Sequence, residues 1–283
     1  MSKPYFRKVT RISGLLAVLL AGPAMADSRP VQPLAPSPTY ADLADLADGA
    51  PLVIRVQPRK VTPLEAERAR GVRPGWARLY VEAKTEALIG GQGAVGEVHS
   101  YLVDVPLDPK GKPQAIKKKS MVIFARSARG MAGALQLVAP DAQIAWDPAL
   151  DARLRKLLSE LYAPGAPQKV TAVREAIHVP GNLAGEGETQ IFLATANGEP
   201  AAISVNSSPG QAARVSVSFS EIVADTGLVP PRDTLAWYRL ACFLPAQLPL
   251  SASASSASGE RARAQEDYRL VLAQLGTCPR NRK

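Results

Sequence analysis

The chain has 283 residues and carries 34 lysine and arginine residues against 25 aspartate and glutamate residues, a formal net charge of +9. This length is enough for one large domain or two small ones and excludes a small peptide scaffold without a core. Aromatic residues make up 5% of the chain, too few for the stacking platforms that grip sugars or exposed bases.

The N-terminus has the three-part pattern of a signal peptide. It carries four basic residues and no acidic one: Lys3, Arg7, Lys8 and Arg11. An apolar run, Ile12–Ala21, follows and ends before Ala24-Met25-Ala26. Because a membrane-spanning helix needs about 20 apolar residues, this run is too short to span. We therefore expect cleavage after Ala26 and a mature, periplasmic or secreted protein of net charge +5 without a transmembrane span.

Residues 27–39 are rich in proline and predict a disordered leader, because proline favours extended polyproline-type backbone. Residues 40–140 predict a β-rich subdomain. Apolar or alternating runs mark its strands at 52–56, 79–89, 98–105 and 121–125, with a short helix at 63–70. These strands predict an antiparallel sheet or a small barrel.

Residues 141–249 predict a second subdomain of mixed type. A helix begins at Pro148 behind the N-cap Asp147 and stops at Pro164. A three-stranded meander and an amphipathic helix follow, at 190–195, 201–205, 214–219 and 234–244. Residues 250–259 predict a serine and alanine linker, and residues 260–278 a C-terminal helix and tail. The fold class is therefore α+β, with mainly antiparallel sheet in the N-terminal half and a meander packed with amphipathic helices in the C-terminal half.

The two cysteines, Cys242 and Cys278, are expected to form a disulfide, because export places them where thiols oxidise. The alternative is one buried thiol and one thiol in a frayed tail. A catalytic thiol is disfavoured, since there is no C-x-x-C pair and no histidine near either cysteine.

The segment from 109 to 140 holds seven basic residues and no acidic one. Within it we select Lys117, Lys118, Lys119 and Arg126 as candidates for binding an anionic surface. Because export removes nucleic acid as a partner, the expected partners are anionic envelope components: lipid phosphate, lipopolysaccharide or peptidoglycan. The alternative is a solvated hairpin whose lysines protect an edge strand, with Arg126 on another face.

A second candidate site is the segment His178–Glu188, in which one of two histidines precedes a loop with three glycines. Asn182, Glu186 and Glu188 could surround a ligand there, with His178, Glu186 and Glu188 as weak catalytic candidates. The alternative is a plain loop between strands.

The known motifs of catalysis and of metal or cofactor binding give no support for a specific enzyme. No G-x-S-x-G, P-loop or H-E-x-x-H pattern occurs, so we expect no cofactor and no metal site. Gly91–Gly96 matches the bare dinucleotide pattern, but the next residues predict a strand, and we interpret it as a hairpin connection. The sequence favours a non-catalytic envelope binding or scaffolding protein, with a hydrolase of unfamiliar type around His178 as the alternative.

Overall fold

The computed structural model describes residue 1 and residues 37–91, 95–220, 228–254 and 257–282. Residues 2–26 of the predicted signal peptide and residues 27–36 of the predicted leader lie outside the described residues. Residues 37–283 form one compact unit of the chain, and its described residues contain two antiparallel sheets and four α-helices. The predicted α+β class is confirmed.

The first sheet has six strands in the order β3-β2-β1-β4-β5, with β6 paired to β4. The strands are β1 Leu52–Pro63, β2 Trp76–Gly91, β3 Val98–Pro106, β4 Met121–Ser127, β5 Leu135–Leu137 and β6 Gln143–Ala145. In β2, Leu79, Val81 and Ala83 are buried as their alternation predicts. The run Met121–Ala125 is buried on both faces, also as predicted.

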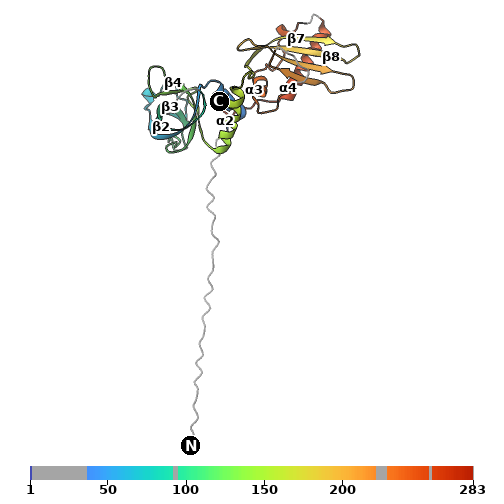
Figure 1. Ribbon diagram of the computed structural model, residues 1–283. Coiled ribbons are helices and arrows are strands. Elements are labelled where there is room, and N and C mark those ends of the chain that lie inside the picture. Colours follow the sequence, from blue (N-terminus) through green and yellow to red (C-terminus); the bar gives the residue numbers. More distant parts are fainter. Residues whose placement is uncertain (2–36, 92–94, 221–227, 255–256, 283) are drawn as a thin grey trace. The chain divides into compact units, whose positions relative to one another are not determined.

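This sheet curls because β1 and β2 pair with three register shifts, and such irregularities bend a strand and increase its twist. The curl brings the two edge strands together, and Ser100 of β3 forms a parallel bridge with Ala134 just before β5. Figure 1 shows β2, β3 and β4 gathered in one group of strands. The result is a small, incompletely closed barrel.

The second sheet has four strands in the order β10-β9-β8-β7. They are β7 Val170–Pro180, β8 Gly187–Thr195, β9 Ala201–Ser207 and β10 Arg214–Ser218. The three predicted strands are present as β8, β9 and β10, and the sequence analysis missed the fourth strand, β7, which has adjacent charged residues and two register shifts against β8. These features break the alternation on which strand prediction depends.

The α-helices are α1 Tyr40–Asp48, α2 Pro148–Leu161, α3 Leu235–Ala241 and α4 Ser258–Leu275. Short 3₁₀ turns lie at η1 Ala66–Arg68 and η2 Leu250–Ala252. Helix α2 begins as predicted, with the Asp147 carboxylate accepting from the backbone N–H of Leu150 at 2.8 Å. Among the described residues, no helix has the length and apolar content needed to cross a membrane.

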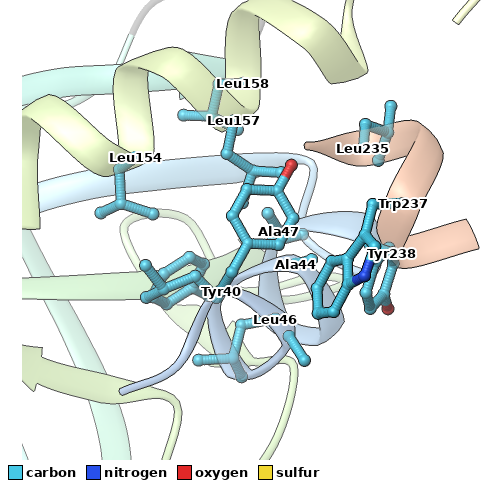
Figure 2. Packing of buried hydrophobic residues seen from close by; sticks show 14 of the residues in the cluster. Tyr40, Ala44, Leu46, Ala47, Leu154, Leu157, Leu158, Leu235, Trp237 and Tyr238 are labelled. Carbon is cyan, nitrogen blue, oxygen red and sulfur yellow. The ribbon is translucent and has the colours of Figure 1, made fainter. Parts of the chain in front are cut away.

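Helix α1 was not predicted, since nine residues are too few for a stable helix by themselves. It is held by a capping box, in which Thr39 and Asp42 each accept from the other's backbone N–H. Its apolar face packs against α2 and α3, as Figure 2 shows for Tyr40, Leu157 and Trp237. Tertiary packing, together with the local capping box, therefore stabilises this helix.

Two further predictions of local structure need correction or completion. The helix predicted at 63–70 is the single turn η1, because none of its residues is buried and a longer helix would have nothing to pack on. In the predicted linker 250–259, the turn η2 is ordered and Ser253 forms a bridge to Ala176 of β7. Residues 255–256 of that segment lie outside the described residues.

Candidate functional site

The two edge strands of the barrel meet along a seam that is closed at both ends by backbone hydrogen bonds. At one end the N–H of Ser100 donates to the carbonyl of Gly133 at 3.0 Å. At the other end the N–H of Asp104 donates to the carbonyl of Pro140 at 2.7 Å. Beside the first bond, Ser100 and Ala134 form a parallel bridge, and β3 lies next to β5 along the seam.

The alternation of the strands shows which backbone groups face the seam. In an antiparallel ladder, successive residues direct their N–H and C=O alternately toward and away from the partner strand. The N–H groups of Ser100 and Asp104 point away from β2. Leu102 lies two residues from each of them, so its N–H and C=O also point away from β2. The same alternation turns the backbone of Leu135 and Leu137 away from β4, because Val138 donates to Phe124 of that strand.

A hollow of about 900 Å³ lies over the seam. We call it the seam groove. Its apolar lining comes from β3, from the turn before β5, from β5 and from the residues that follow it: Leu102, Met131, Leu135, Leu137, Val138 and Ala139. Leu102 is 46% exposed and Met131 62% exposed, so apolar surface is open to solvent here. A volume in this range is typical of sites for small ligands.

Some charged side chains of the seam groove are paired within the protein and others are not. Arg78 and Asp104 form a two-pronged ion pair with distances of 2.7 and 2.8 Å, and this bond raises the pKa of the Arg78 guanidinium. Arg126 and Arg129 also line the groove, and within the part of the chain that the structure describes neither side chain has a hydrogen bond or ion pair. The groove therefore offers two cations and one neutralised pair.

Carboxylates near Arg126 do not neutralise it, because other groups already hold them. Arg126 borders a second hollow of about 350 Å³ that contains Asp42, Asp45 and Asp141. Asp42 accepts the backbone N–H groups of residues 281 and 282. Burial opposes its charge, but these bonds and that of Thr39 together lower its pKa. Asp45 and Asp141 form ion pairs with arginines at 280 and 282 of the C-terminal tail.

Tyr101 and His99 hold the seam from inside the barrel. The Tyr101 hydroxyl donates to Oε1 of Gln143 at 2.7 Å, and burial raises its pKa well above the ordinary value. It therefore stays a neutral donor. His99 is buried, and its Nδ1 lies 3.3 Å from the carbonyl of Gly133, beside the Ser100 bond.

The predicted basic candidates lie in two places. Lys117, Lys118 and Lys119 are exposed and immediately precede β4, while Arg126 is near the other end of that strand. At about 3.3 Å of rise per residue, β4 separates the lysines from Arg126 by roughly 20 Å. The structure brings Arg126 together with Arg129 at the seam groove and leaves the three lysines apart from it.

The predicted loop candidates are also separated from one another. Glu186 closes its own loop, because its carboxylate accepts the backbone N–H groups of Asn182 and Leu183 at 3.0 and 3.1 Å. Glu188 accepts from the side chain of Gln190 at 3.0 Å. His178 lies on β7 and does not contact either carboxylate among the described residues. The structure does not assemble these three residues into one site.

His178 instead belongs to a buried polar network with partners that the sequence analysis did not select. Its Nδ1 lies 2.8 Å from the hydroxyl of Thr189, which donates to the carboxylate of Asp267 at 2.5 Å. Because that hydroxyl gives its proton to Asp267, it accepts from Nδ1–H of His178, and in the neutral form of the ring this tautomer has the lone pair on Nε2. Arg263 lies 3.4 Å from the other carboxylate oxygen of Asp267.

The ring of His178 packs over the backbone of Gly187. A Cβ at position 187 would lie 2.8 Å from Cε1 and 3.0 Å from Nε2 of that ring, so a side chain there would displace the histidine. The network of His178, Thr189, Asp267 and Arg263 joins α4 to the sheet. Periodicity could mark Asp267 as a carboxylate on the buried face of α4, but no sequence signal pairs it with Thr189.

No protein-family model matches this chain, and no curated protein matches it significantly. Among the described residues, no three histidine, cysteine, aspartate or glutamate side chains gather as ligands for a metal ion. The function must therefore be argued from the geometry above.

The predicted disulfide between Cys242 and Cys278 is confirmed, with Cα atoms 5.2 Å apart. It joins the end of α3 to the tail that follows α4. The indole N–H of Trp237 in α3 donates to the carbonyl of Leu275 at the end of α4, at 2.9 Å. The disulfide therefore holds these two helix ends in a contact that side chains also make.

Proposed function

We propose that the protein is an exported, non-catalytic binding protein of the cell envelope, and that its seam groove holds an anionic envelope component. The observation that carries this proposal is the pair Arg126 and Arg129, which face an apolar hollow without a side-chain partner among the described residues. Guanidinium groups bind carboxylates and phosphates through two parallel hydrogen bonds, and they do so more strongly beside apolar surface. Candidate ligands are lipid phosphate, lipopolysaccharide and peptidoglycan.

Export is supported by the signal-peptide pattern and by the disulfide, which is stable in an oxidising compartment. The test is mass spectrometry of the protein purified from its own cells, together with fractionation. We expect the mature chain to begin at Asp27 and to be found outside the cytoplasm. An intact N-terminus in the cytosolic fraction would contradict export and, with it, the choice of envelope ligands.

Binding is tested by sedimentation with anionic phosphatidylglycerol vesicles, with lipopolysaccharide and with isolated peptidoglycan. We expect Arg126→Gln/Arg129→Gln to weaken binding to at least one of these probes by about tenfold or more, because two charge-assisted contacts are lost. The matched control is Lys117→Gln/Lys119→Gln, which removes the same charge far from the groove. If both variants lose binding equally, or if only the lysine variant loses it, the protein binds by diffuse surface charge and the seam groove is not the binding site.

A second candidate function, a hydrolase around His178, is favoured by one observation. The bond from His178 to Thr189, and from Thr189 to Asp267, orients the imidazole and leaves Nε2 as a base. Glu186 and Glu188 take no part in this arrangement. If this candidate is correct, His178→Ala abolishes turnover of a substrate found by screening ester, amide and glycoside libraries. If no turnover depends on His178, the network is structural.

A further inference from the structure

We infer that the ligand of the seam groove is a single-chain lipid phosphate, a phospholipid that has kept one acyl chain. Its phosphate contacts Arg126 and Arg129, and its acyl chain lies over the apolar lining. This inference rests on the proposed function and selects one ligand class for the same site. It follows from the charges of the groove, from its apolar side chains and from its length.

The charges of the groove favour a phosphate. Arg126 and Arg129 are three positions apart, near the end of β4 and in the turn that follows, and both line the hollow. The one carboxylate among the lining residues, Asp104, is held by Arg78. A phosphate monoester at pH 7 has a charge of about −1.5 to −2 and three acceptor oxygens, so it matches two guanidinium groups. A single carboxylate has one charge and matches only one of them.

The uncharged part of the lining is mostly apolar and favours an alkyl chain. Leu102 and Met131 are large apolar side chains that are exposed to solvent. Val138 and Ala139 extend this surface to Arg126, because all three line both the seam groove and the second hollow. Each methylene that is fully buried against such a surface improves affinity by about fourfold. A sugar would place hydroxyl groups there, and these lose water without gaining a partner.

The groove is about as long as one acyl chain. It lies over the seam between Ser100 and Asp104, and four residue steps of strand span about 13 Å. One acyl chain covers about half of a hydrocarbon core of about 30 Å. The hollow of about 900 Å³ is in the range that encloses one small ligand. The ligand therefore has one chain, which lies on the side chains above the seam while β3 and β5 stay side by side.

The test is calorimetric titration of the purified protein with butyl, hexyl, octyl and decyl phosphate, all kept below the concentrations at which they form micelles. We expect affinity to rise about fourfold for each two methylenes added, which corresponds to burial of half of the chain surface. Decyltrimethylammonium has the same chain with a positive headgroup and should not bind measurably. Arg126→Gln/Arg129→Gln should weaken binding of decyl phosphate by about tenfold or more, and Lys117→Gln/Lys119→Gln should leave it nearly unchanged.

A second pair of variants tests the apolar lining. Met131→Gln replaces an exposed apolar side chain of the groove by a polar one of similar length. It should weaken binding of decyl phosphate by about fivefold and leave binding of butyl phosphate nearly unchanged, because only the longer chain loses apolar contact. Leu183→Gln is the matched control, since Leu183 is also exposed, at 63%, but lies in the loop before β8.

The outcomes separate this inference from the proposed function. If affinity does not depend on chain length, or if Met131→Gln and Leu183→Gln have equal effects, the lipid inference is overturned. The proposed function still stands in that case when the arginine variant loses binding to lipopolysaccharide or peptidoglycan. If decyltrimethylammonium binds as tightly as decyl phosphate, the arginines do not select the ligand and the inference is again overturned. If no probe binds in an arginine-dependent way, the proposed function itself fails.

Discussion

The two sheets of this protein use their polar groups in opposite ways. In the C-terminal sheet, His178 and Thr189 form a chain of hydrogen bonds with Asp267 of α4. In the N-terminal barrel, Arg126 and Arg129 line the seam groove and have no side-chain partner among the described residues. A buried polar group bound within the protein stabilises the fold, whereas an accessible unbound one is available to a ligand. From this comparison we expect the His178–Thr189–Asp267 network to contribute to stability and the arginines of the seam groove to contribute to ligand binding.

The largest change in stability is expected when the disulfide of the C-terminal half is removed. Replacing both cysteines, as Cys242→Ser/Cys278→Ser, should lower the free energy of unfolding by about 4 kcal/mol, because a closed loop of this length restricts the unfolded chain. Urea denaturation measures the change. Reductant should destabilise the natural protein and leave the double variant unaffected. An unchanged midpoint in the variant would mean that the disulfide contributes nothing to stability.

The next test breaks the buried network itself. Thr189→Val keeps the shape of the side chain but removes the hydroxyl between His178 and Asp267, and should cost about 2 to 3 kcal/mol of unfolding free energy. Thr171→Val on β7 is the matched control, because the hydroxyl of Thr171 bonds a carbonyl at an exposed position. The control should change stability by less than about 0.5 kcal/mol. Similar effects from both variants would contradict the role assigned to the network.

A smaller effect is expected at Asp42, which connects α1 to the C-terminal tail. Asp42→Asn should cost about 1 kcal/mol at neutral pH, since it weakens the cap of α1 and the bonds to the tail. The pKa of Asp42 is lowered in the folded protein, so its stabilising effect is present above the ordinary value of about 4 and is lost as the pH falls further. The two proteins should therefore become equally stable in acid. A difference that persists at pH 2 would contradict this cause.

The smallest change in stability is predicted at the seam. Arg126→Gln/Arg129→Gln should alter the free energy of unfolding by less than about 0.5 kcal/mol, because neither side chain has a partner to lose. Thermal unfolding of the variant beside the natural protein measures this. A loss of several kcal/mol would show that these arginines are structural, and the contrast between the two sheets would then disappear.

Part of the fold and little of the candidate site were predictable from the chain. The alternation in Leu79–Ala83, the capped start of α2 and the cysteine pair each depend on neighbouring residues or on composition. The seam groove depends on the meeting of β3 with β5, which are separated by β2, β1 and β4 in the sheet. The basic segment did contain Arg126 and Arg129, but its charge pattern could not separate them from Lys117, Lys118 and Lys119.

The sequence by itself determined the α+β class, most strands, the helix at Pro148 and the disulfide. Periodicity and caps act over short range, and the cysteine pair is inferred from the compartment that the signal-peptide pattern predicts. Tertiary structure decided the rest. It stabilised α1, added β7 to the meander, paired Thr189 with Asp267 across 78 positions and brought β3 beside β5. The physical reason is the same in each case: these features arise from contacts between segments that are distant in the chain, and no local pattern records which distant groups will meet.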